Sequence, residues 1–162
     1  MHRKLLAATI AATFALGCSS SPTAPTPVGT TSTQPASIIG QWTGTYRVTS
    51  CVESGSAAGS GFCSSLGQGG GLTLTPQQTG QNVSGNMGIG GYSPIPVTGT
   101  VGTDNVVALS GSGPIQLNAS LSLTTWRGTL SGSSIAGNLG YTITTAAPVG
   151  IATVQGTFTV TK

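Results

Sequence analysis

Apolar and polar residues alternate with a period of two along several segments of this chain. Residues 42–49, 115–123 and 152–160 carry apolar side chains at alternate positions, with Gly in place of one of them at 44 and at 156. Successive side chains of a strand point to opposite faces, so the pattern predicts strands with one apolar and one polar face. Such strands must bury their apolar faces together, as they do in an antiparallel barrel or sandwich. No segment longer than a turn has the pattern of a helix.

A short unit recurs within these segments: an apolar residue, any residue, Gly, then Thr or Asn, then another apolar residue. It occurs at residues 42–46, 83–87, 97–101, 126–130, 135–139 and 154–158. The Gly lies two positions from each apolar residue and therefore faces the same side as they do. Gly weakens the middle of a strand unless a bend or a close approach requires it. The repetition predicts sharply coiled strands, or room for bulky neighbours, in a narrow closed sheet.

Clusters of turn-forming residues divide the chain into about eight or nine strands. The predicted turns lie at residues 69–71, 78–80, 90–91, 103–105, 111–114, 124–125, 131–133 and 148–150. Short strands joined by short turns indicate an antiparallel meander. We therefore expect an all-β domain, a single antiparallel up-and-down β-barrel of about eight strands, because closure removes the edge strands. A β-sandwich is the alternative.

Charged residues are scarce, and this scarcity limits the available chemistry. The chain has five Lys or Arg, two Asp or Glu, and a single His at position 2. A serine nucleophile would lack a histidine base, and the only pair of carboxylates for acid–base catalysis would be Glu53 with Asp104, both in expected loops. A metal site would lack ligands. We therefore expect no enzyme activity, no cofactor and no bound metal.

The N-terminus has the features of an export signal. Residues 2–4 are basic, and residues 5–16 are mostly apolar but too few to span a bilayer. The Ala-Leu-Gly sequence that precedes Cys18 resembles the lipobox of bacterial lipoproteins, in which the signal is removed before a lipid-bearing cysteine. The resemblance implies a signal peptide over residues 1–17, lipidation of Cys18 and attachment to a membrane through that lipid. An ordinary secretory signal is the alternative.

Removal of the signal changes the net charge of the chain, and the lipobox implies a cellular location. The remaining charged residues are three basic ones, Arg47, Arg127 and Lys162, and two acidic ones, Glu53 and Asp104. The net charge of the processed chain is therefore +1. This leaves no basic patch for nucleic acid. The lipobox resemblance implies a place in the cell envelope. In a Gram-negative cell this is the outer membrane, at its periplasmic face or at the cell surface.

A tether and one domain follow the signal. Residues 18–37 are rich in Ser, Thr and Pro and carry no charge, so we expect a disordered linker. The domain then covers residues 38–162. Cys51 and Cys63 remain within it, and export to an oxidising compartment predicts a disulfide between them. In the chain-entropy model a bridge over so short a loop stabilises the fold by about 3 kcal/mol.

The first predicted strand opens on Gly40-Gln41-Trp42. This Gly-x-Trp resembles the first strand of the calycin superfamily, the lipocalin-like and avidin-like barrels, and residues 72–85 are similar to a hairpin of small bacterial lipoproteins with lipocalin-like domains. The resemblance implies a barrel that binds a small apolar ligand in its lumen. The candidate ligand-binding residues are the bulky side chains of the apolar face, which fill a core or line a lumen: Trp42, Tyr46, Met87, Trp126, Tyr141 and Phe158.

The expected function is therefore that of a lipid-anchored, non-enzymatic cell-envelope protein that binds a small apolar ligand. One alternative is a protein-recognition module with a fully packed core, such as a protease inhibitor or an envelope scaffold, whose partner is another envelope protein. A second alternative is a barrel that spans a membrane, because alternation alone does not say which face lies inside.

Overall fold

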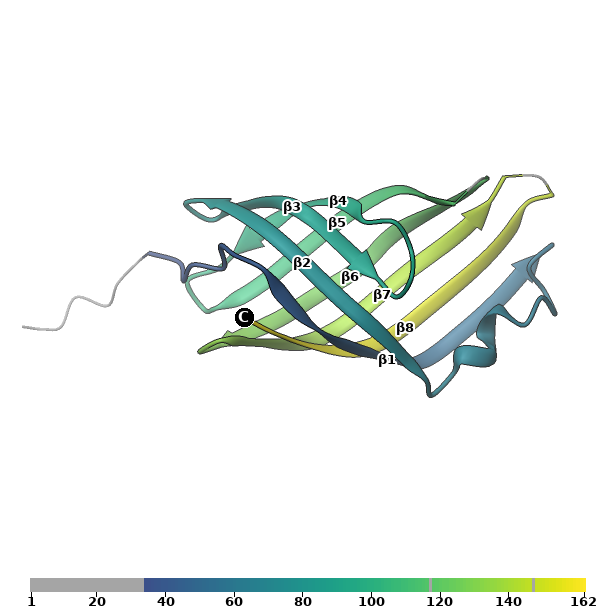
Figure 1. Cartoon of the computed structure of the whole chain (residues 1–162), viewed down its shortest axis with the longest axis horizontal. Coiled ribbons are helices and arrows are strands. Elements are labelled where there is room, and N and C mark those ends of the chain that lie inside the picture. The colour runs from purple at the N-terminus through teal and green to yellow at the C-terminus, as the bar shows by residue number, and fades with distance from the viewer. Residues whose placement is uncertain (1–33, 117, 147) are drawn as a thin grey trace, which may run out of the picture. The chain divides into compact units, whose positions relative to one another are not determined.

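The computed structural model describes residues 34–116, 118–146 and 148–162, and β-strands dominate it. Each strand pairs antiparallel with the next, and β1 pairs with β8, so eight strands close a single up-and-down barrel (Figure 1). This confirms the predicted all-β barrel over the sandwich. The elements are β1 (Trp42–Gly55), the short 3-10 helix η1 (Phe62–Ser65), β2 (Gly69–Thr79), β3 (Asn82–Ile89), β4 (Ile95–Val101), β5 (Val106–Gln116), β6 (Ala119–Ser131), β7 (Ser134–Thr145) and β8 (Gly150–Thr161).

The alternating apolar and polar residues of the sequence point to the inside and the outside of the barrel, respectively. Along β8, the side chains of Val154, Phe158 and Val160 are buried, while those of Thr157 and Thr159 are exposed. The same order holds around the barrel, with apolar side chains inside and mainly Thr, Ser and Asn outside. A barrel that spans a bilayer carries an apolar outer band instead. In the part of the chain that the structure describes, no helix is long and apolar enough to cross a membrane.

Residues 34–41 cover one end of the barrel, which we call the plugged end. Ile38 is fully buried there, and its N–H donates to Oε1 of Gln78 over 2.9 Å. Nε2 of Gln78 donates in turn to the carbonyl oxygen of Ala36 over 3.1 Å. Nε1 of Trp42 donates to the carbonyl oxygen of Ile38 over 2.7 Å. These hydrogen bonds fix the chain across the barrel end before β1 begins.

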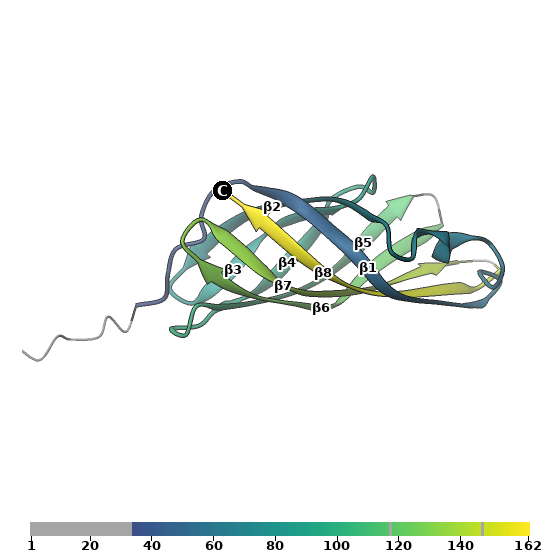
Figure 2. The ribbon, with the colours of Figure 1, turned by 90° about the horizontal axis from the view of Figure 1, so that it is seen from below.

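The opposite end, which we call the open end, is formed by only part of the wall. Pairing of β1 with β2 ends at Arg47 and Gly69, whereas β1 continues to Gly55 along β8. Pairing of β4 with β5 ends at Gly111, whereas β5 continues to Gln116 along β6. At this end, strands β5, β6, β7, β8 and β1 therefore extend past β2, β3 and β4 as a curved trough (Figures 1 and 2).

The recurring glycines stand where neighbouring strands approach closely. At five of the six glycines the close neighbour is backbone alone or nearly so, but Gly128 differs. A Cβ at Gly128 would also crowd the side chains of Ile135 and Phe158. One predicted reason for the repeat, room for bulky side chains, therefore applies at Gly128. At the other five positions a Cβ would overlap backbone atoms of the adjacent strand: Gly44, Gly85, Gly99, Gly137 and Gly156.

Several predicted boundaries are wrong. Residues 69–71 begin β2, residues 111–114 lie within β5, and residues 124–125 lie within β6 beside a register shift. Conversely, the predicted strand at residues 115–123 is divided by the turn between β5 and β6, where Asn118 has a φ of 62°. Glycine marks turns in most proteins, but in this chain it also occupies strand interiors, which explains the errors at residues 69–71 and 111–114. The other predicted turns, at residues 78–80, 90–91, 103–105, 131–133 and 148–150, are confirmed.

Candidate functional site: an aromatic cleft at the open end

The connection between β1 and β2 is tied to β1 at the open end. Cys51 of β1 forms the predicted disulfide with Cys63 of η1, their Cα atoms 5.5 Å apart. The Glu53 carboxylate accepts hydrogen bonds from the N–H of Gly59 over 2.9 Å and from the N–H of Cys63 over 2.6 Å. Glu53 thus lies in a strand rather than in the expected loop. Together these contacts fix the position of Phe62, the neighbour of Cys63.

Beside this connection lies a hollow of about 420 Å³, which we call the aromatic cleft. Its rings come from four separate elements: Tyr46 of β1, Phe62 of η1, Tyr92 of the β3–β4 turn and Tyr141 of β7. The walls between the rings are glycines at residues 69–71 and 90–91. All lining side chains are uncharged. The cleft therefore offers ring surfaces and bare backbone rather than charge.

Glycine is needed for this arrangement at Gly70. A Cβ there would lie 2.9 Å from Cε1 of Tyr46 and 3.1 Å from its hydroxyl oxygen. Across the barrel interior, the Tyr46 ring meets that of Tyr141 edge to face, with centroids 6.3 Å apart and planes at 85°. This is a preferred geometry for an aromatic pair. The two rings thus form a fixed inner wall of the cleft.

The hydroxyl groups of Tyr92 and Tyr141 are held in the protonated form. Burial, followed by a side-chain hydrogen bond with Tyr46, raises the pKa of Tyr141 above the usual tyrosine value of 10.0. Burial and the nearby Tyr46 also raise the pKa of Tyr92. Tyr92 and Tyr141 are therefore neutral at physiological pH, and a neutral phenol both donates and accepts hydrogen bonds.

The other four predicted ligand-binding residues belong to the core. Trp42, Met87, Trp126 and Phe158 are each no more than 3% exposed, and none of them lines the cleft. Tyr141 is equally buried at 3%, but its ring does line the cleft. Trp126 stacks on Phe158 with ring centroids 4.2 Å apart. Nε1 of Trp126 is buried without a hydrogen-bond partner among the described residues. Of the six candidates, the structure therefore brings only Tyr46 and Tyr141 together at the cleft.

Phe62 and Tyr92 are cleft residues that the sequence pattern missed. Both lie outside the alternating strands, so neither belongs to the apolar face that the period of two defines. A signal was nevertheless present for each. Phe62 precedes a disulfide-bonded cysteine, and Tyr92 follows Gly90-Gly91, which removes side chains next to it.

A second hollow, of about 310 Å³, lies along the trough. Phe62 lines this hollow as well as the aromatic cleft, and Ile143 of β7 and Ala152 of β8 supply apolar surface. The remaining lining comes mainly from Ser, Ala and Pro residues of the two adjacent connections. Phe62 thus lines both the aromatic cleft and this second hollow.

The two carboxylates of the chain are not arranged as an acid–base pair. Glu53 lies at the open end, whereas Asp104 lies in the β4–β5 turn at the plugged end. Oδ1 of Asp104 accepts a hydrogen bond from the N–H of Val106 over 3.1 Å. Across the described residues, no three His, Cys, Asp or Glu side chains come together. Both carboxylates thus bind backbone amides.

Comparison with protein-family models gives no match, and comparison with curated proteins gives none either. The predicted signal peptide and Cys18 lie outside the described residues.

Proposed function

We propose that this chain is a lipid-anchored, non-enzymatic protein of the cell envelope that binds a small apolar ligand in the aromatic cleft. The observation that carries the ligand proposal is the meeting of Tyr46, Phe62, Tyr92 and Tyr141 around one hollow of about 420 Å³. This volume lies within the range of small-molecule sites, which are lined mainly by apolar and aromatic groups. The anchor rests on the lipobox resemblance at Cys18.

The lining supports a neutral ligand with a flat apolar part. No charged side chain is among the lining residues to balance a charged ligand, and burying an unpaired charge is costly. Aromatic edges and faces favour stacking against a planar group. The Tyr92 and Tyr141 hydroxyls can bind one or two polar atoms of the ligand. The proposed ligand therefore binds at the open end, while the packed centre of the barrel stabilises the fold.

The size of the cleft sets an expected affinity. At about −0.3 kcal/mol per non-hydrogen atom, a ligand of roughly 20 such atoms binds with about −6 kcal/mol, a dissociation constant of tens of micromolar. A neutral fluorescent probe of that size, N-phenyl-1-naphthylamine, suits the measurement because its emission rises in apolar surroundings.

The test compares two Trp substitutions in the full-length chain. Gly91→Trp fills the cleft from a position where a Cβ meets nothing within 4 Å. Thr98→Trp adds the same side chain at an exposed position of β4, outside the cleft. We expect saturable probe binding to the wild type and to Thr98→Trp, and at least a tenfold weaker affinity for Gly91→Trp. Equal affinity in both variants would refute the site.

The anchor is tested separately. Cells that express the full-length chain are fed an alkyne-labelled fatty acid, and labelled protein is detected after membrane fractionation. We expect label and membrane association in the wild type and their loss in Cys18→Ser. Cys51→Ser serves as the matched control, because it removes a cysteine of the barrel rather than of the lipobox. Label retained in Cys18→Ser would refute the anchor without affecting the cleft.

A further inference from the structure

Both arginines of the barrel lie in one row across its outer face. Arg47 of β1 pairs with Thr157 of β8, Thr157 pairs with Asn138 of β7, and Asn138 pairs with Arg127 of β6. All four side chains are exposed. Three strand spacings of about 4.8 Å separate the two guanidinium-bearing residues, about 14 Å along the sheet. We call these four residues the arginine row.

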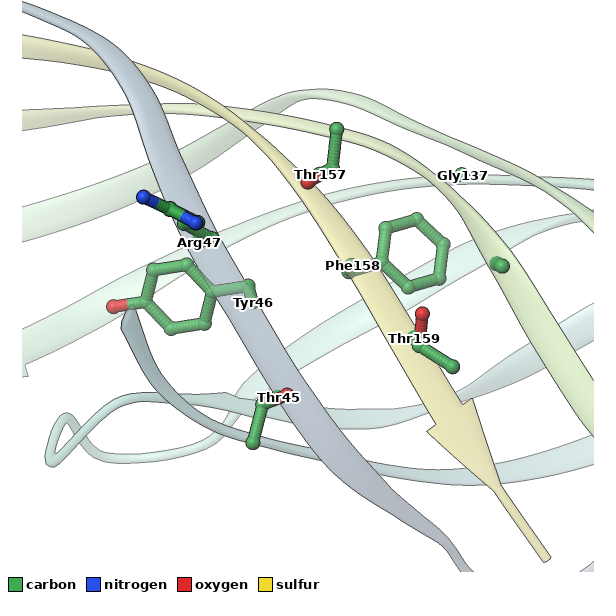
Figure 3. A pocket seen from close by; sticks show the side chains of 8 residues that line it. Thr45, Tyr46, Arg47, Gly137, Thr157, Phe158 and Thr159 are labelled. Atoms are coloured by element: carbon green, nitrogen blue, oxygen red, sulfur yellow. The ribbon is translucent and has the colours of Figure 1, made fainter. Parts of the chain in front are cut away.

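A hollow of about 390 Å³ adjoins the row at Arg47. It exists because the outward side chains of the next row, which include Ala136, are short. The hydroxyls around it are free to bind a ligand, since in the described part of the chain no hydrogen bond ties the side chains of Thr45, Thr157 or Thr159. Its polar outer side chains come from the neighbouring strands β1 and β8 (Figure 3): Thr45, Arg47, Thr157 and Thr159.

The negative charges of the chain are used elsewhere. The two acidic side chains are Glu53, which points toward Gly59 and Cys63, and Asp104, which binds the N–H of Val106 at the plugged end. Neither faces the arginine row. The two guanidinium groups therefore lie on an otherwise uncharged surface without a carboxylate to neutralise them.

We infer that the arginine row binds an anionic polysaccharide, a chain that carries carboxylate groups among many hydroxyls. A guanidinium group binds a carboxylate through two parallel hydrogen bonds. The groups between the arginines, Thr157 and Asn138, both donate and accept hydrogen bonds, as sugar hydroxyls require. The separation of the arginines calls for a ligand long enough to reach both. None of the exposed large apolar side chains belongs to the row, so it offers nothing for insertion into lipid.

The test measures binding of the full-length chain to polygalacturonate, with uncharged dextran as the reference polymer. We expect binding to polygalacturonate that falls with added salt, as exposed ion pairs do. Arg47→Gln and Arg127→Gln should each weaken it roughly three- to fivefold, and the double variant at least tenfold. Lys162→Gln is the matched control, because it makes the same charge change beside Trp42, far from the row.

Three results would overturn the inference. The first is equal weakening by Lys162→Gln, which would show that net charge alone attracts the polymer. The second is equal binding to dextran. The third is a preference for phosphatidylglycerol over phosphatidylcholine vesicles that depends on the same two arginines and exceeds the preference for polygalacturonate over dextran. Unfolding curves of each variant exclude loss of fold as the cause.

Discussion

The two tryptophans of the barrel make a matched experiment on buried polar groups. Both indoles are 1% exposed, so replacement by Phe removes the same atoms from the same degree of burial. Their Nε1 groups differ. That of Trp42 donates to the carbonyl oxygen of Ile38 over 2.7 Å, whereas that of Trp126 has no partner among the described residues.

The expected difference follows from the cost of an unpaired buried group. The packing lost on going from indole to phenyl is similar at both sites and largely cancels in the comparison. Trp42→Phe leaves the Ile38 carbonyl without this donor, at a cost of about 1–3 kcal/mol. Trp126→Phe removes an unpaired donor and so recovers a penalty of about the same size. The free energy of unfolding should be at least about 2 kcal/mol lower for Trp42→Phe than for Trp126→Phe.

Urea unfolding followed by far-ultraviolet circular dichroism measures this difference. Each variant retains one Trp, whose fluorescence gives a second probe of the same transition and tests two-state behaviour. Equal losses of stability, or a greater loss for Trp126→Phe, would refute the reasoning. Such a result would mean that Nε1 of Trp126 finds an acceptor in solution, such as a buried water.

Three further predictions concern the stability of the barrel. Because the folded-state pKa of Tyr141 is raised, its stabilising effect is complete below pH 10 and lost above it; urea unfolding at pH 9 and pH 11 should show a smaller alkaline loss for Tyr141→Phe than for the wild type, and equal losses would contradict this. Replacing Cys51 and Cys63 by Ser should lower the free energy of unfolding by about 3 kcal/mol, and no change in melting temperature would argue against a stabilising bridge. Gly99→Ala should cost about 1–3 kcal/mol in thermal unfolding because its Cβ meets backbone of β5. Gly71→Ala, with nothing within 4 Å, is the control and should cost less.

The closed barrel was predictable because its signal is local and repeated. Residues 42–49 and 152–160 alternate apart from Gly44 and Gly156, and the structure places them side by side as β1 and β8. The strand ends were less predictable. The apolar positions Ile115, Leu121 and Leu123 keep the same alternation across the β5–β6 turn, and no Gly or Pro marks that turn. A period of two describes which face a side chain takes, but not where the chain reverses.

The candidate site was only half predictable for the same reason. Tyr46 and Tyr141 belong to the apolar face and could be selected by pattern, although the pattern could not separate them from Met87, which is core. The position of a side chain along the barrel axis depends on strand register and on how far each strand extends. The sequence of a single strand determines neither. Phe62 and Tyr92 reach the cleft through connections, which carry no periodicity.

The two ends of the barrel differ, because residues 34–41 cover only one of them. The chain enters the barrel beside Ile38, at the end opposite to the aromatic cleft. Residues 34–41 therefore cover only the plugged end and leave the mouth of the aromatic cleft uncovered. A ligand would therefore enter the cleft without displacing this segment, so the hydrogen bonds of Ile38, Gln78 and Trp42 would stay intact when the cleft is filled.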